Sequence, residues 1–473
     1  MTRTDATGPG HAAGRPDAER SDTAWSDMAW PDAGRPDADA DSALVRRLAR
    51  DVAERLSEHA SGDGRDLADD DARSYAHMLI NQGLEDEARS RVRAGLAPLA
   101  LQVEQALARA VQDRLFGLGR LQRYLDDDQV SDIALNGCDR VFVTYRDGRR
   151  ERAAAVADDD AELVDLVRLA ATRMGRSERR FDAADPELTM QLPDGSRLHA
   201  IRDVSGRPCI SIRRHRFELS HLHELVAGGM LDRGLAGLLA SMVRARRNIV
   251  VCGATGAGKT TLLRALINEV PPDERLVTVE DSLELNLDHF GELHPDVVAL
   301  EARPPNIEGR GGIELEQLVR TGLRMNPDRV IVGEVRGPEL VPMLLAMTQG
   351  RDGSMGTMHA ASARHVFDRA LMYGLLPPYE LPVDASAHLF ASAVDFVVFV
   401  GDQRARGGPR RRAVATVLEV VGVDGRTISA NEVCAAGPDG RARVVPGMPM
   451  RAETRADLER AGLRPEVEGS GRP

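Results

Sequence analysis

The sequence predicts a mixed α/β protein whose largest domain is a doubly wound sheet. The first observation is an apolar run, residues 249–252, of the kind expected for a parallel strand buried on both faces. A glycine-rich loop and a helical segment follow it directly. The second observation is that helical and apolar segments then alternate, with helices at 261–268 and 315–323 and strands at 276–279 and 330–332.

Changes in composition divide the chain into five expected segments. These are a disordered tail (1–41), a helical segment (42–118), a small α+β domain (119–217), the doubly wound domain (218–445) and a loose C-terminal tail (446–473). The first tail is rich in Asp, Ala, Pro and Gly and repeats Ala-Gly-Arg-Pro-Asp-Ala. It also carries Trp25 and Trp30, so it is either an idle tail or a short docking peptide.

Spacing and turn residues predict the elements of the two segments before the large domain. Apolar residues three and four apart, among them Leu44, Leu48 and Val52, predict two or three packed helices. Beyond residue 119, the turn pairs Asn136-Gly137 and Asp147-Gly148 separate short apolar runs that read as strands. A helix at 161–174 and strands at 198–201 and 209–213 complete the small domain.

Composition limits the classes of function. Hydrophobic content of 42% and charged content of 29% are ordinary globular values, so 473 residues suffice for two or three domains. The net charge of −12 argues against a general nucleic-acid binder. Four scattered cysteines without a C-x-x-C pair indicate free thiols in a reducing cytoplasm. We expect neither a membrane span nor a signal peptide.

The chain has a single lysine among 62 basic residues, and its position is specific. Lys259 completes the pattern G-x-x-x-x-G-K-[ST], formed by Gly253, Ala254, Thr255, Gly256, Ala257, Gly258, Lys259 and Thr260 and followed by Thr261. Backbone N–H groups of such a loop bind phosphate oxygens, the lysine neutralises the outer phosphates, and the threonine hydroxyl ligates Mg²⁺. We therefore expect ATP and Mg²⁺ as ligands.

Hydrolysis also needs a carboxylate that orients or deprotonates water. One candidate is Glu284, in an acidic cluster that begins at Glu280 directly after a predicted strand. The other is Glu334, one glycine after the strand 330–332. Strand ends line the nucleotide crevice of a doubly wound sheet, so both can reach it. His359 is a further candidate, although a lone histidine is more often structural.

Four ordered motifs carry a resemblance to a known family. After the phosphate loop come Glu-Asp-x-x-Glu (280–284), Arg-x-x-Pro-Asp-x-x-x-x-Gly-Glu-x-Arg (324–336) and Gly-Ser-x-x-Thr-x-His-Ala (353–360). Together they resemble the Walker A motif, Asp box, Walker B motif and His box of the type II/IV secretion ATPases. The similarity extends over residues 118–440, and the tight-adherence (Flp) pilus assembly ATPases are the branch it resembles most.

The resemblance implies roles for individual residues. Glu334 would act on Mg²⁺ and water, with Thr260 as the second metal ligand, and Glu284 would lie near the γ-phosphate. His359 would sense that phosphate or bridge to Glu334. Arginines of the small domain would approach the phosphates, and those that match are Arg197 and Arg213 or Arg214. Further candidates are Arg320 and Arg336.

The family also implies an assembly and a place in the cell. Its members resemble one another as homo-hexameric rings with a RecA-like motor domain. They are seated on inner-membrane platform proteins at the cytoplasmic face of the membrane. The chain departs from the family pattern at four positions: His199, Pro342, Arg351 and Ala361.

Other functions remain open at this point. A DNA-transfer motor would need a basic channel with aromatic residues, and an aromatic content of 3% disfavours it. A nucleotide-regulated scaffold with little turnover is compatible with the departures from the pattern. The basic stretch 404–412 is either a solvated loop or a contact for an acidic partner or anionic lipid.

Overall fold

The computed structural model describes residues 38–63, 69–174, 180–214, 220–303, 305, 309–403, 411–445 and 447–464. The expected tail before residue 38, with its two tryptophans, lies outside these residues, as does most of the basic stretch, 404–410. The chain divides into two units, Met1–Gly119 and Arg120–Pro473, and each is described by itself.

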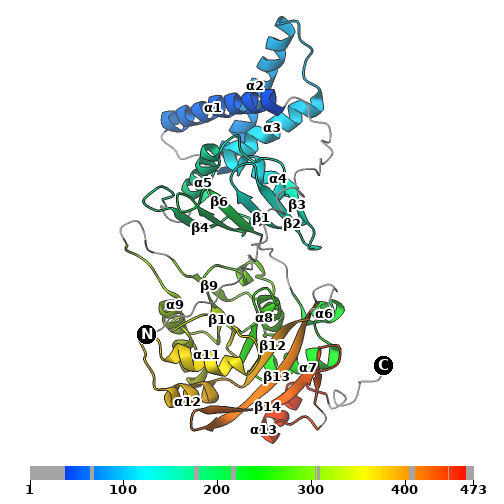
Figure 1. Ribbon diagram of the computed structural model, residues 1–473, viewed down its shortest axis with the longest axis vertical. Helices are drawn as coiled ribbons and strands as arrows, with labels where there is room; N and C mark the ends of the chain where they lie inside the picture. Colours follow the sequence, from blue (N-terminus) through cyan, green and yellow to red (C-terminus); the bar gives the residue numbers. More distant parts are fainter. Residues whose placement is uncertain are drawn as a thin grey trace, which may run out of the picture. The chain divides into compact units, whose positions relative to one another are not determined.

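Among its described residues, the first unit has three α-helices that pack on one another (Figure 1). They are α1 (Ala38–Asp63), α2 (Asp69–Arg93) and α3 (Leu101–Phe116). Each helix contributes to one small core, for example through Leu48, Leu79 and Val111, which are 4% exposed or less. The helical period seen in the sequence thus corresponds to the buried stripes of three helices.

The second unit begins with a small domain built on an antiparallel sheet of strand order β3-β2-β1-β6-β5-β4. Its strands are β1 (Val130–Asn136), β2 (Val141–Tyr145), β3 (Arg150–Ala153), β4 (Glu187–Gln191), β5 (Arg197–Ile201) and β6 (Cys209–Arg213). Its helical elements are η1 (Gly119–Leu121), α4 (Gln122–Leu125) and α5 (Asp160–Met174). Gly137 makes the turn after β1 with φ 89°, a backbone conformation that favours glycine, and a Cβ there would displace the Arg207 guanidinium, 2.2 Å away.

The larger sheet has the strand order β15-β14-β13-β12-β7-β11-β10-β8-β9 in the described residues. From β12 to β9 the strands run parallel, and β13, β14 and β15 are antiparallel. The strands are β7 (Ile249–Gly253), β8 (Leu276–Glu280), β9 (Val297–Glu301), β10 (Arg329–Val335), β11 (Met355–His359), β12 (Phe396–Gln403), β13 (Arg411–Asp424), β14 (Thr427–Ala436) and β15 (Ala442–Val444).

Helices cover both faces of this sheet, which gives three layers. One face packs against α6 (Leu222–Ala227), α7 (Arg233–Arg244), α8 (Lys259–Ile267) and α13 (Ala452–Arg460). The other packs against α9 (Leu315–Leu323), α10 (Leu340–Thr348), α11 (His365–Gly374) and α12 (Val383–Ala393). Residues alternate along β7 between the two cores, Ile249 and Val251 facing one and Val250 and Cys252 the other. The expected doubly wound fold is therefore confirmed, with an antiparallel extension.

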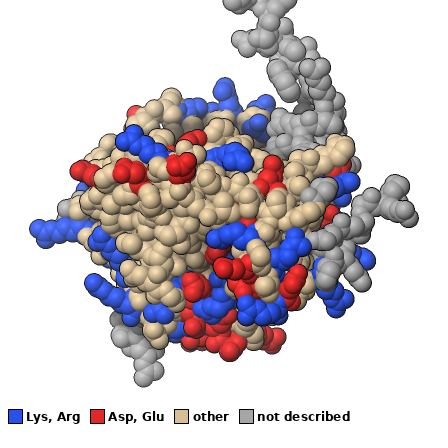
Figure 2. All heavy atoms as spheres, turned by 90° about the horizontal axis from the view of Figure 1, so that it is seen from below, with Lys and Arg blue, Asp and Glu red and all other residues tan. Residues whose placement is uncertain are grey.

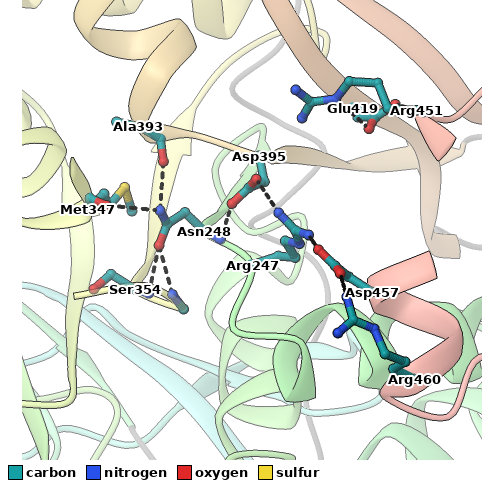
Figure 3. A network of polar contacts seen from close by, with 11 residues as sticks. Arg247, Asn248, Met347, Ser354, Ala393, Asp395, Glu419, Arg451, Asp457 and Arg460 are labelled. Atoms are coloured by element: carbon teal, nitrogen blue, oxygen red, sulfur yellow. Dashed lines mark hydrogen bonds and ion pairs between the residues drawn. The ribbon is translucent and has the colours of Figure 1, made fainter. Parts of the chain in front are cut away.

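The C-terminal segment differs from the loose tail expected from residue 446. Residues 452–460 form α13, whose Leu458 is fully buried in the core beside α7. Polar contacts add to this packing: Arg247 pairs with Asp457, and Arg451 donates to the buried Glu419 at 3.0 Å (Figure 3). The helix is thus part of the domain. Residues 465–473 of the expected tail lie outside the described chain.

A buried amide organises the end of the sheet where β7 begins. Asn248 accepts from the backbone N–H groups of Gly353 (2.9 Å) and Ser354 (3.0 Å) and donates to the carbonyl of Ala393 (2.8 Å) (Figure 3). Its own N–H donates to Asp395 at 2.9 Å. Asn248 therefore ties the starts of β7, β11 and β12 together at the edge opposite the phosphate loop.

Candidate functional site

The phosphate loop joins the central strand to its following helix. β7 ends at Gly253, and α8 begins at Lys259, so five residues form the turn. Gly256 and Gly258 take φ values of 70° and 101°, a region that favours glycine, and this lets successive N–H groups point to one side. The loop adds the dipole of the α8 N-terminus to those donors, which favours a bound phosphate.

The other loop residues take up positions consistent with a cradle open on one side. Ala254, Thr255 and Gly256 are exposed, whereas Ala257 is buried beneath them. Thr260 and Thr261 lie in the first turn of α8 and are half-buried.

The side chain of Lys259, the only lysine in the sequence, is buried in the phosphate loop. It is 7% exposed, and its Nζ donates to the Ala254 carbonyl oxygen and to Nδ1 of His359, each at 3.2 Å. Burial lowers the pKa of Lys259, opposed by the carboxylates of Glu334 and Glu284. The amine is therefore preorganised beside the phosphate-binding N–H groups.

Four parallel strands bring the candidate residues to one edge of the sheet. His359 at the end of β11 pairs with Gly253 at the end of β7. Glu334 lies near the end of the next strand, β10, and Glu280 ends β8. Parallel strands of matching register end at the same edge, so the loop, the histidine and the acids converge there.

A chain of contacts connects the lysine to the Walker B glutamate. A lysine only donates, so Nδ1 of His359 accepts its hydrogen bond and the ring proton is assigned to Nε2. Nε2 in turn contacts Oε1 of Glu334, while Arg336 pairs with Oε2. Burial, followed by the charge of Lys259, lowers the pKa of His359, which favours this neutral ring. Both oxygens of Glu334 are thus oriented.

A second pair of oxygens lies at the start of α8. The Thr260 hydroxyl is 3.5 Å from Oε2 of Glu284. Hydroxyl and carboxylate oxygens are the ligands that Mg²⁺ prefers, and one or two suffice because the ion keeps waters and phosphate oxygens. The donors fit Mg²⁺. Glu334, the other expected ligand, contacts His359 and Arg336, and its role at the metal stays a prediction. No cluster of three His, Cys, Asp or Glu side chains suited to a metal occurs in the described residues.

Sequence reasoning did not single out the role of Glu280. Its side chain is 3% exposed, and its Oε1 accepts from the backbone N–H groups of Glu284 and Leu285, both at 3.0 Å. Burial raises the pKa of Glu280 to about 8. A Cβ on Gly333 would lie 2.8 Å from Glu280 Cγ, so the glycine before Glu334 leaves room for this acid. Glu280 shapes the segment that carries Glu284.

The arginine candidates lie in three places. Arg197 and Arg213 pair across β5 and β6 of the small sheet, where Arg213 donates to Asp132 at 3.0 Å and Arg214 contacts the Asp127 carbonyl. Arg336 is in the Glu334 cluster. Arg320 lies on α9 and donates to the Tyr379 hydroxyl at 2.8 Å.

A phosphate loop at the end of a central parallel strand, with a histidine and carboxylates on the neighbouring strand ends, defines a P-loop nucleotide hydrolase. Residues 115–462 match the family described as Type II/IV secretion system protein, and the chain belongs to that family. It is a secretion-system ATPase that binds ATP, as its motifs lead one to expect.

Similar proteins have names from conjugal transfer and from type IV secretion. A Mycobacterium tuberculosis protein named for a proposed role in conjugal transfer is 39% identical over 320 residues, 66% of this chain and 87% of that protein. The type IV secretion system protein PtlH of Bordetella pertussis is 31% identical over 327 residues, 63% of this chain and 93% of PtlH. These names support the family rather than its tight-adherence pilus branch.

Among solved structures, this chain is similar to the VirB11 ATPase of the Brucella suis type IV secretion system in complex with sulphate. It is 29% identical, covers 67% of this chain and 96% of its own, and has a TM-score of 0.34. Within the described residues, no helix is both long and apolar enough to span a bilayer.

Proposed function

We propose that this chain is a ring-forming motor that hydrolyses ATP to drive transport, or pilus assembly, across the cell envelope. The chain of contacts from Lys259 through His359 to Glu334 carries the proposal, because it joins the phosphate-binding amine to a carboxylate suited to orient water. Arg336 holds the other oxygen of that carboxylate.

In this proposal His359 reports the state of the phosphates. Outer phosphate oxygens and Nδ1 of His359 are both acceptors for the N–H donors of the Lys259 amine, so they compete for them. Weakening of that bond frees the imidazole to turn and to change its contact with Glu334. A bound γ-phosphate and the position of the water-orienting carboxylate are thereby coupled.

Mg²⁺ would be held by Thr260, with Glu284 as a nearby carboxylate and Glu334 acting on the ion and its water. When bound, the ion supplies positive charge that stabilises the phosphate oxygens during transfer. Glu280 positions Glu284 through the backbone of the same segment.

Assembly and location follow the family. We place the motor as a homo-hexamer at the cytoplasmic face of the membrane, on inner-membrane platform proteins. Arg197 and Arg213, paired on β5 and β6, would supply positive charge to phosphates at domain or subunit boundaries. Residues 42–118 and 119–217 are proposed as separate domains, and the motor domain proposed for 218–445 extends to include α13.

The cargo has two candidates. Pilus subunits or a secreted protein fit the sequence resemblance to the tight-adherence branch. DNA is the alternative, favoured by the conjugal-transfer name of the relative at 39% identity. On the face in Figure 2, arginines and acidic residues are interspersed around a broad uncharged area rather than forming a basic track. That face offers no continuous line of cations to a nucleic-acid backbone.

The test is ATP turnover by the purified full chain, with and without single-stranded DNA. We expect turnover that DNA does not change, and a loss of about 10² or more in Glu334→Gln with ATP binding retained, because the amide keeps the shape but not the charge. Stimulation by DNA would favour DNA transfer. ATP binding without ATP turnover by the unaltered chain would favour the alternative of a nucleotide-regulated scaffold. Prepilin and platform genes beside this one would support the pilus branch.

A further inference from the structure

The β12–β13 ribbon passes beside the phosphate loop and extends beyond it. Val400 on β12 is level with Gly253, the last residue of β7, and pairs with Val414 on β13. Arg412 precedes Val414 by two residues, and its backbone lies opposite that of residue Asp402, two residues beyond Val400. Arg412 is therefore placed past the carboxyl edge of the sheet, on the side where the loop lies.

The stem of Arg412 reaches the loop itself. A Cβ on Gly258 would lie 3.5 Å from Cδ of Arg412 and 3.5 Å from Cε of Met230. Met230 fixes the ribbon here, since its carbonyl oxygen accepts from the N–H of Val414 at 3.1 Å. Arg412 is exposed, and its guanidinium pairs with no carboxylate in the part of the chain that the structure describes.

The strand order decides which end of the nucleotide Arg412 faces. β7 has β11 on one side and β12 on the other. His359, Glu334 and Glu284, which surround the γ-phosphate in the proposed function, all come from the β11 side. Arg412 comes from the β12 side, so the γ-phosphate end of a nucleotide held in the loop points away from it.

We propose that Arg412 is a nucleotide-binding residue whose guanidinium pairs with the α- or β-phosphate held by the loop around Gly258. This assignment rests on the nucleotide site of the proposed function but not on the roles of Glu334 or His359. Arg412 supplies charge to phosphates shared by ATP and ADP, and it strengthens the binding of both equally.

The test measures binding of ATP, ADP and inorganic tripolyphosphate by calorimetry to Arg412→Ala, Arg412→Lys and the unaltered chain. Loss of one charge-assisted contact is expected to weaken all three ligands by about tenfold or more, with a KM effect larger than the kcat effect. Lysine is expected to restore most of the affinity, because a phosphate accepts either cation. The matched control is Arg426→Ala, an exposed arginine in the turn between β13 and β14, and this variant is expected to bind all three ligands normally.

Three results would overturn the assignment. Unchanged ADP binding with weaker ATP binding would place Arg412 at the γ-phosphate. Unchanged tripolyphosphate binding with weaker ATP and ADP binding would place it at the base or ribose. Unchanged binding of every ligand, with a circular dichroism spectrum like that of the unaltered chain, would leave it outside the site. If the unaltered chain binds nucleotide but does not hydrolyse it, the proposed motor function is wrong. The binding test of Arg412 still applies in that case.

Discussion

Lys259 is enclosed on two sides, by the Ala254 carbonyl and by Nδ1 of His359, each 3.2 Å from its Nζ. A planar guanidinium is wider than an ammonium and cannot keep both contacts in a side chain that is 7% exposed. Lys259→Arg is therefore expected to weaken ATP binding and to abolish turnover, although it conserves charge. Nucleotide titration and a phosphate-release assay measure the two effects. Turnover at the unaltered rate would contradict this account of the lysine.

Glu280 makes the stability of the chain depend on pH. Its pKa rises from the usual 4.5 to about 8 on folding, because burial disfavours the carboxylate. The folded state then binds the proton more tightly than the unfolded state. The stabilisation is fully present below about pH 4.5 and is lost as the pH rises through about 8.

The variant Glu280→Gln isolates this effect, since the amide keeps the shape and does not titrate. We expect the unfolding free energy of the unaltered chain, relative to the variant, to decrease steadily from pH 5 to pH 8. Urea unfolding at several pH values measures it. A difference that stays constant over this range would mean that Glu280 is ionised in the folded protein.

Some of the candidate site could be predicted at the scale of residues, and some could not. Lys259, Glu334 and His359 were identifiable because each belongs to a motif that is local in sequence. The burial of Glu280 and the approach of Arg412 to Gly258 depend on which strands are neighbours. Neither follows from spacing along the chain.

Among the elements, those with strong periodic patterns were predicted and the others were not. β7 is buried along its whole length, so its sequence is continuously apolar. β9 and β14 alternate or are only partly buried, and β15 has three residues, so they left no clear pattern. Most of α13 is charged, and Leu458 is its only large apolar residue. Its packing is a tertiary effect.

Leu458 is expected to anchor α13 despite this weak pattern. Leu458→Ala would remove a fully buried side chain beside α7 and leave a cavity, at a cost of about 2–5 kcal/mol in unfolding free energy. Chemical denaturation measures the loss. Glu459→Ala, an exposed neighbour on the same helix, is the control and should cost less than about 0.5 kcal/mol. Equal effects of the two would mean that the helix is not packed.

For the whole molecule, we expect activity to depend on assembly. If Arg197 on β5 and Arg213 on β6 contact a nucleotide at a domain or subunit boundary, turnover per subunit should rise with protein concentration. An arginine that contacts the transferred phosphate can raise the rate of hydrolysis about 10³-fold. Specific activity over about two decades of concentration, with light scattering in the presence of ATP, measures this.

Arg197→Ala should give the low rate at every concentration, and Arg152→Ala, an exposed arginine on β3 of the same sheet, should behave like the unaltered chain. A monomer with the same specific activity at all concentrations would exclude the ring mechanism and favour a solitary switch.

The buried lysine has a practical consequence for chemical labelling. Because no other side chain in the protein is an amine, an acylating reagent that attacks side-chain amines has one target, Lys259. Its lowered pKa increases the fraction of nucleophilic free amine, while its enclosure makes the reagent compete with whatever fills the loop. The extent of acylation at Lys259, read by mass spectrometry, thus reports the fraction of chains whose phosphate loop is empty.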